Sequence, residues 1–224
     1  NGYASRETHK NQADMTEFTI QYNKAFKGGH SLNALAGYSW NKNNNQEAFM
    51  DNYNFPTDDY SYNNMAAGTA LKDGKATEKT YQEEYKLVGY FGRINYNYQG
   101  KYYLSASIRH EGSSKFGADH KWGTFPAVSI GWNLKEESFL KNVNFLSFLK
   151  LRAGYGITGT IPGNPYLSLN TLDLGGYGYY GGQWTTLLRA SSNPNPDLRW
   201  EKKKETNIGL DFAFFNDRIS GSID

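Results

Sequence analysis

One stretch, residues 88–109, limits the possible folds more than any other part of the chain. It reads VGYFGRINYNYQGKYYLSASIR, two alternating runs joined by a short turn at NYQGK. One set of alternate positions holds mainly Val, Ile, Leu and Tyr, and the other set is rich in Arg, Asn and Ser. Because side chains along a strand point to opposite faces in turn, this period of two predicts a hairpin with one apolar and one polar face.

The same alternation recurs along the chain and predicts an all-β protein of about eight antiparallel strands. The predicted strands span about residues 14–24, 31–40, 81–98, 101–109, 126–134, 149–156, 198–214 and from 219 onward. Long polar connections follow the second, fourth and sixth strands, short turns follow the first, third and seventh, and a moderately short connection follows the fifth. The connection after the fifth strand is predicted to hold a short helix.

Composition excludes several classes of protein. The net charge is only +2, so no strong attraction to nucleic acid is expected, and without cysteine there is no disulfide framework. No apolar run approaches the roughly 20 residues of a membrane helix. The mean hydropathy of −0.74 is compatible with a membrane barrel, whose strands alternate lipid-facing and lumen-facing residues. No signal peptide is visible and both ends look cut, so a piece of a longer protein is expected.

Two architectures fit this pattern. Long polar loops at one end of the strands and short turns at the other are typical of an outer-membrane β-barrel. A soluble β-sandwich also alternates, because each of its strands has one buried face. The regular sorting of connections by length favours the antiparallel transmembrane barrel, and a soluble carbohydrate-binding sandwich remains the alternative.

In a barrel, the two faces of each strand have different surroundings. Tyr96, Tyr98 and Tyr102 lie beside a short turn, where an aromatic girdle meets the membrane interface. Phe212 and Phe214 take the same position before another short turn. The opposite face is predicted to point into a hydrated lumen or against a plug; its candidate residues are Arg93, Asn95, Arg109, Lys150 and Arg152. Glu201, Glu205 and Asp211 share one parity and are candidates to balance that charge.

Four segments in order carry a family resemblance. They are RHEGSSKFG (residues 109–117), KWGTFPAVSIGW (121–132), LKLRAGYGITG (149–159) and NPDLRWEKKKETNIGLDF (195–212). Together they resemble the barrel of SusC/RagA-type TonB-dependent outer-membrane transporters. The departures are small: Glu111 stands where Asp is usual, Ala127 stands where Ser is usual, and the sequence after Gly159 is shifted.

The resemblance implies a 22-stranded barrel in the outer membrane of a Gram-negative bacterium, closed by an N-terminal plug. It implies energy coupling through the TonB–ExbB–ExbD complex, a SusD-like surface lipoprotein as partner, and oligosaccharides or peptides as substrates. Residues 1–224 then form part of the barrel domain, with the plug domain and TonB box outside them. A passive outer-membrane pore without a plug is the alternative. No enzymatic activity, cofactor or nucleic-acid partner is expected.

A glycine-rich loop, GGYGYYGGQW, is the candidate ligand site. Tyr177, Tyr179, Tyr180 and Trp184 are candidates to offer flat aromatic platforms to sugar rings. Packing against a neighbouring loop or a lid protein explains the same residues.

A second cluster in the sequence contains metal-ligating residue types. His110, Glu111, Asp119 and His120 lie close together, but their spacing is not that of a known ligand motif. No metal site is therefore predicted there. No set of residues predicts a catalytic site either.

Overall fold

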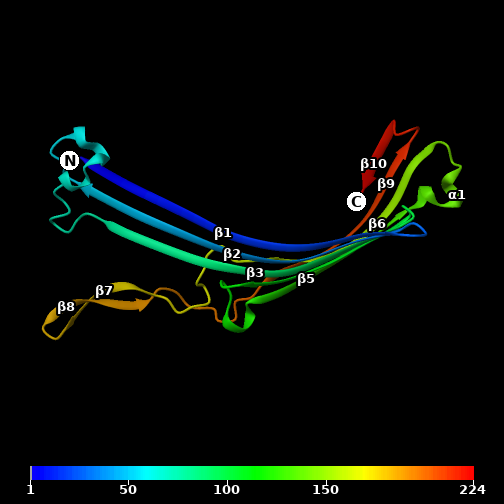
Figure 1. Cartoon of the computed structure of the whole chain (residues 1–224). Coiled ribbons are helices and arrows are strands. Elements are labelled where there is room, and N and C mark those ends of the chain that lie inside the picture. The colour runs from blue at the N-terminus through cyan, green and yellow to red at the C-terminus, as the bar shows by residue number, and fades with distance from the viewer. Residues whose placement is uncertain (1) are drawn as a thin grey trace. The chain divides into compact units, whose positions relative to one another are not determined.

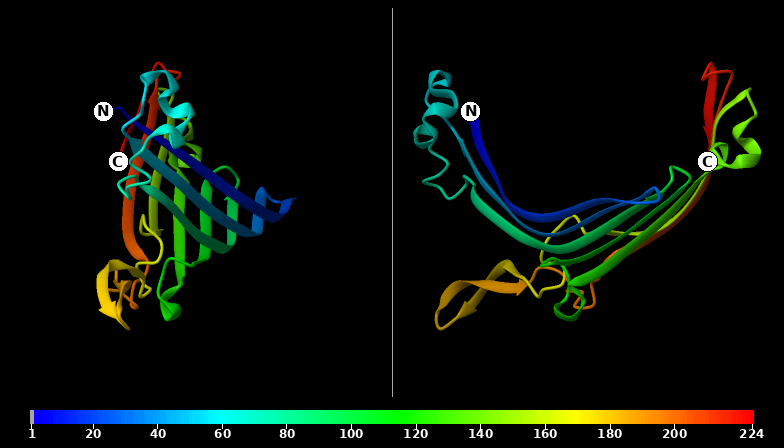
Figure 2. Two further views of the ribbon diagram at one scale, coloured as in Figure 1. Left: turned by 90° about the vertical axis from the view of Figure 1, so that its left-hand side faces the viewer. Right: turned by 45° about the vertical axis from the view of Figure 1, so that its right-hand side comes forward.

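The computed structural model describes residues 2–224, apart from the side chains of residues 60–62, and consists mainly of β-strands. Eight strands form one sheet in the order β1-β2-β3-β4-β5-β6-β9-β10 (Figures 1 and 2). These strands are β1 (Tyr3–Phe26), β2 (His30–Tyr53), β3 (Glu78–Tyr98), β4 (Tyr102–Ser113), β5 (Trp122–Asn133), β6 (Leu146–Thr160), β9 (Glu201–Phe214) and β10 (Ile219–Ile223). Strands β7 (Leu172–Tyr180) and β8 (Gln183–Ala190) pair separately as an antiparallel hairpin.

Helical segments are short. The predicted helix after the fifth strand of the main sheet is confirmed as α1 (Ser138–Lys141), which follows the 3-10 turn η4 (Leu134–Glu136). The other 3-10 segments are η1 (Asp58–Asn63), η2 (Met65–Ala67) and η3 (Ala118–His120). Within the described part of the chain, no helix is long and apolar enough to cross a membrane.

The chain divides into two compact units, residues 1–15 with 41–86 and residues 16–40 with 87–224. In the first unit, the connection between β2 and β3 folds around Asn52, whose side chain is buried. The Asn52 amide nitrogen donates to the carbonyl oxygens of Met65 (2.9 Å) and Gly68 (2.8 Å), and its amide oxygen accepts from the Leu71 nitrogen (3.1 Å). The Asn52 side chain therefore ties three parts of this connection together.

Several strands, β1 and β2 above all, are longer than the sequence predicts. β1 and β2 each contain 24 residues, so the prediction of a loop over residues 41–80 is wrong for 41–53 and 78–80. These extensions are rich in Asn, Glu and Thr and lack apolar alternation. Backbone ladder bonds form regardless of side-chain polarity, so a strand continues into water without the sequence signal that marks its apolar part.

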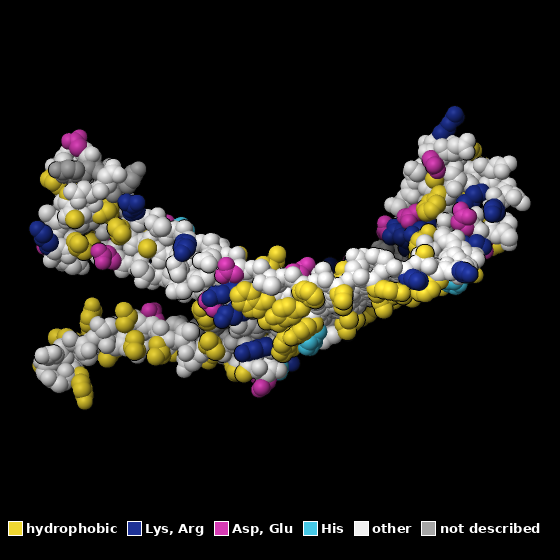
Figure 3. Space-filling view, viewed as in Figure 1, with side chains coloured by type: hydrophobic (Ala, Val, Ile, Leu, Met, Phe, Trp, Pro, Cys, Tyr) yellow, Lys and Arg dark blue, Asp and Glu magenta, His cyan; other side chains and the backbone are white. Residues whose placement is uncertain are grey.

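In the second unit, the strand register sorts the side chains onto two faces. Ile94 pairs with Ala106, and Ala106 pairs with Val128, so these three residues form one row on what we call the apolar face. Ile94 remains 49% exposed and Val128 45% exposed. Figure 3 shows hydrophobic side chains gathered along this part of the sheet. A contiguous face that is both apolar and exposed is typical of a surface that contacts lipid or another protein.

Aromatic rings lie in two rows across the apolar face. In one row, Tyr102 stacks on Tyr98 (centroids 6.2 Å apart) and on Trp132 (6.3 Å). In the other row, Trp122 stacks on Tyr90 (6.2 Å) and on His110 (4.8 Å). Trp122 and Trp132 are ten residues apart on β5, which corresponds to about 33 Å along the strand. For a strand tilted by about 40° from the bilayer normal, this length spans about 25 Å of bilayer thickness. This matches the height of the apolar band of a membrane barrel.

The turn after β5 is fastened to the first of these rows through Glu137. Its carboxylate accepts hydrogen bonds from the Tyr102 hydroxyl (2.6 Å) and the Trp132 indole nitrogen (3.1 Å), and the Lys101 ammonium lies 3.4 Å away. The hydrogen bond from Tyr102, followed by that from Trp132, lowers the pKa of Glu137 below its ordinary value. The Glu137 carboxylate therefore joins the turn to residues of β4 and β5 and to Lys101.

We expect Glu137→Gln to loosen the segment 134–146, because an amide binds these donors less strongly than a carboxylate does. Hydrogen–deuterium exchange of the full-length protein at neutral pH should be faster across this segment. In the wild type, the lowered pKa of Glu137 stabilises the folded turn at pH values above the ordinary pKa of a glutamate. This stabilisation is lost as the pH falls through the lowered pKa. The neighbouring Glu136→Gln is the control. Equal exchange in the Glu137 variant and the wild type would contradict the role of this carboxylate.

Candidate functional site

The polar face of the sheet is the first candidate. Asn95 pairs with Ser105, Ser105 pairs with Ser129, and Ser129 pairs with Gly154, so the polar rows cross four strands. The predicted inward-facing residues all share this face: Arg93, Asn95, Arg109, Lys150 and Arg152. The wall that they form offers amides, hydroxyls and cations to whatever lies against it.

Two of these cations are held in place on β6. Arg152 donates Nε and Nη2 to the two oxygens of Asp211, each at 2.9 Å, and Nη2 also reaches Asp224 at 3.0 Å. The Lys150 ammonium lies 4.4 Å from the centre of the Tyr103 ring. Of the three acidic residues considered for charge balance, Asp211 pairs with Arg152. Glu205 instead lies beside Lys203 on its own strand.

Arg109 is fixed in a different way. It makes a bidentate pair with Glu111 (2.9 and 2.7 Å), donates to the Ser39 hydroxyl (3.2 Å) and lies over the Phe91 ring. The Glu111 that departs from the family motif therefore keeps the carboxylate function of an aspartate. Such a clamp orients the guanidinium without leaving it free for a ligand.

A line of amides continues the polar wall. Asn95 donates to Asn33 at 3.3 Å, and Asn33 donates to Asn23. Asn95 is among the residues that the sequence predicts for this face, whereas Asn23 and Asn33 are not. The sequence contains the pattern that would have identified them, because Asn23 and Asn33 lie at the alternate positions of the first two predicted strands that form their polar face. Arg93 is exposed and faces Ser107 across the ladder.

The second candidate is the β7–β8 hairpin, which forms where the glycine-rich sequence predicts a loop. Tyr179 pairs with Trp184 in register, and their rings make an edge-on contact at 5.5 Å. Tyr177 lies on the same face of β7, whereas Tyr180 lies on the opposite face. Their exposed fractions range from 65% for Tyr179 to 84% for Tyr180. Gly181 and Gly182 form the turn with positive φ angles, which explains the glycine pair.

The four residues around the β4–β5 loop do not assemble into one cluster of ligands. His110 hydrogen-bonds to the Thr124 hydroxyl (2.9 Å), Glu111 binds Arg109, and His120 lies 3.4 Å from Asp197. Within the described residues, the one group of three potential ligands lies elsewhere, at Glu7, His9 and Glu47.

The similarity to known proteins covers the whole chain. The family model described as "TonB dependent receptor-like, beta-barrel" matches residues 1–224. TonB-dependent receptor P3 of Formosa agariphila is 35% identical over 223 residues, which cover 100% of this chain and 22% of that relative. TonB-dependent receptor SusC of Bacteroides thetaiotaomicron is 45% identical over 159 residues, 68% of this chain and 16% of that relative. The chain thus spans about a fifth of the length of these curated relatives.

Solved structures agree on the fold. The RagAB peptide transporter superposes with a TM-score of 0.88 at 24% identity, covering 97% of this chain and 23% of the transporter chain. The RagAB peptide importer in its closed-closed state gives a TM-score of 0.87 over the same shares. At this identity, the likeness shows the fold alone.

Proposed function

This chain belongs to the TonB-dependent receptor-like β-barrel family and is of the SusC/RagA type, and we propose that it forms part of the wall of an outer-membrane nutrient importer. The observation that carries the proposal is the opposite chemistry of the two faces of one sheet. One face exposes Ile94, Val128 and Ile130 between two rows of aromatic rings. The other holds Arg152 and Asn95 in fixed polar contacts.

Lipid on one side and water on the other explain both faces. In hydrocarbon, all backbone groups need partners within the sheet, and apolar side chains cost nothing when exposed to lipid. On the lumen side, fixed amides and paired charges bind polar solutes or a plug without leaving bare charge. A β-sandwich would bury one of these faces against a second sheet, and the exposed apolar row does not fit that arrangement.

The whole protein is proposed to be a barrel of 22 strands with an N-terminal plug, opened by TonB–ExbB–ExbD and covered by a SusD-like lipoprotein. Its substrates are proposed to be oligosaccharides or peptides. Support comes from the similarity to SusC and from the similarity in fold to the RagAB peptide transporter. The charged and amide-rich polar face is compatible with either substrate class.

Transport tests this proposal directly. Uptake of a labelled oligosaccharide or peptide library by cells carrying the full-length protein should stop when TonB is deleted. Barrel folding, followed by its heat-modifiable band on a gel, should be unchanged. A passive pore predicts uptake that persists without TonB, and that result would sink the importer proposal in favour of the pore.

The exposed aromatic face of the hairpin is proposed as a contact for the substrate. Tyr179→Ala and Trp184→Ala should each weaken binding about 2- to 10-fold, since one aromatic contact contributes about 0.5–1.5 kcal/mol. Calorimetric titration of the full-length protein with the transported ligand measures this change.

Tyr180→Ala is the matched control, because Tyr180 is even more exposed but lies on the opposite face of the hairpin. Equal losses in all three variants would point to a general effect on the hairpin. Unchanged affinity in the Tyr179 and Trp184 variants would exclude the aromatic face from the site.

A further inference from the structure

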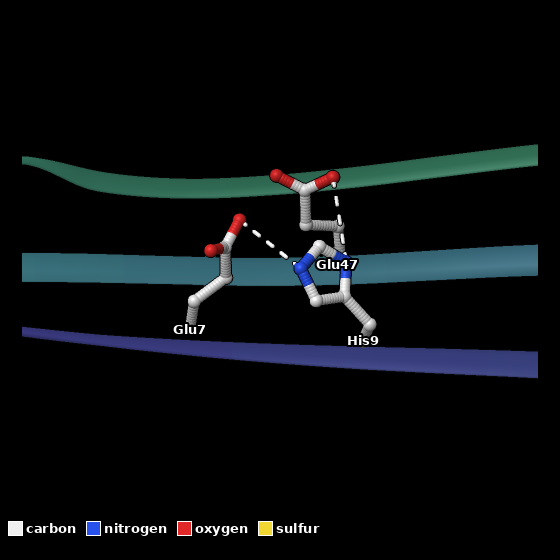
Figure 4. Close-up of side chains that lie close together, drawn as sticks. All are labelled: Glu7, His9 and Glu47. Carbon is white, nitrogen blue, oxygen red and sulfur yellow. Dashed lines mark ion pairs between the residues drawn. The ribbon is translucent and has the colours of Figure 1, made fainter.

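A histidine lies between two glutamates in the extended part of β1 and β2 (Figure 4). His9 Nε2 is 3.2 Å from Glu7 Oε1, and His9 Nδ1 is 3.8 Å from Glu47 Oε2. One nitrogen and two oxygens of these side chains lie within 4.8 Å of one another. We propose that Glu7, His9 and Glu47 form a binding site for a divalent transition-metal ion, with Zn²⁺ as the preferred ion.

The strand geometry brings these side chains together. Glu7 and His9 are two residues apart on β1, so they project from the same face. Glu47 comes from the neighbouring strand β2, where residues opposite one another have Cβ atoms about 5 Å apart. All three residues belong to the first compact unit, so the site depends only on the pairing of two adjacent strands.

The donor set suits zinc. Imidazole nitrogen and carboxylate oxygen bind Zn²⁺ at about 2.0–2.2 Å, which separates the ligand atoms of a tetrahedral site by about 3.4 Å. The contact between His9 Nε2 and Glu7 already has this separation. Glu47 lies beside the other ring nitrogen, Nδ1, and a rotamer change of Glu47 brings its oxygen towards an ion on Nε2. The three side chains are 43–65% exposed, so they are able to rotate, and water completes the coordination. Hard cations such as Ca²⁺ prefer oxygen ligands alone, so the imidazole selects against them.

The charge around the cluster favours a cation. Among the residues that the structure describes, neither Glu7 nor Glu47 has a Lys or Arg within ion-pair distance, and the partner of both is His9. The arrangement around Glu84 on β3 is different, because Lys42 (2.9 Å) and Lys86 (3.2 Å) neutralise its carboxylate. Two carboxylates that share one imidazole leave negative charge, which a divalent ion neutralises.

The test uses the full-length protein in detergent, with any affinity tag removed and zinc added as the only probe. After equilibrium dialysis, elemental analysis should find one equivalent of zinc fewer per chain in His9→Gln and in Glu47→Gln than in the wild type. Glu84→Gln is the matched control and should retain the full zinc content. Co²⁺ substitution should give a visible absorption band in the wild type that both site variants lose.

The folded state of each variant is checked by its heat-modifiable band. Zinc content and cobalt spectra that are equal in the wild type and in either folded site variant would overturn the proposal. The inference does not rest on transport, since zinc binding is measured on the purified protein without substrate.

Discussion

Ile94→Arg is expected to destabilise the folded barrel by about 2–4 kcal/mol in a lipid bilayer, the cost of Arg or Lys at the midplane of a membrane barrel. Ile94 lies midway between Tyr90 and Tyr98, which belong to the two aromatic rows. Val128→Arg should have a similar effect, because Val128 lies in the same cross-strand row through Ala106. The row neighbours of Ile94 on the apolar face, Ala106 and Val128, have no polar side-chain group to accept hydrogen bonds from the guanidinium.

Asn95→Arg is the matched control, since Asn95 is the next residue along β3 and lies on the polar face. Its effect should be small. Urea titration of the full-length protein refolded into lipid vesicles measures the three free energies of unfolding. If Asn95→Arg were as costly as Ile94→Arg, the assignment of the two faces to lipid and lumen would be wrong.

This difference between neighbouring residues was predictable from sequence, because the period of two is sharpest where one face of a strand meets hydrocarbon. The alternation of Ile94 and Asn95 specifies their faces without any knowledge of strand partners. The order of the eight strands in the main sheet and the short turns between them follow from the same signal. The structure confirms the strand order and the short turns after β1, β3 and β9, whereas the connection after β5 (residues 134–145) is longer than the connection after β4 (residues 114–121).

Other features gave no comparable signal. The outer part of β2 reads NKNNNQEAF, which has no apolar alternation, so its strand structure depends on ladder bonds to β1 and β3. The strands β7 and β8 were not predicted for a different reason, because their glycines suggested a loop. The cluster of Glu7, His9 and Glu47 was missed because a strand over residues 3–13 was not predicted.

To predict contacts between residues that are far apart in the sequence, the pairing register of the strands must be known as well as the strands themselves. The pairing of Arg152 with Asp211 joins residues 59 positions apart, and sequence parity placed both on one face without making them partners. The sequence therefore predicted which residues share the polar face, but it did not predict which charged residues pair there.

Trp200→Ala is expected to cost about 3–5 kcal/mol locally, the usual effect of removing a buried large aromatic side chain. Trp200 is 7% exposed and packs against Phe116 (centroids 4.9 Å apart) and Phe125 (5.1 Å). Its indole nitrogen donates to the carbonyl oxygen of Lys121 (2.9 Å). The three rings come from the loop after β4, from β5 and from the segment before β9. Removal of Trp200 should therefore destabilise all three segments together.

Hydrogen–deuterium exchange of the full-length protein locates this effect. Exchange should increase in residues 113–125 and 195–200, while the hairpin of β3 and β4 beside the short turn at Gln99 keeps its protection. Trp200→Phe should lie between the wild type and Trp200→Ala, because it retains the ring but loses the hydrogen bond to Lys121. An increase confined to the segment around Trp200 would show that the cluster does not couple the loops. Coupled opening would instead show that this part of the sheet and its loops behave as one cooperative unit.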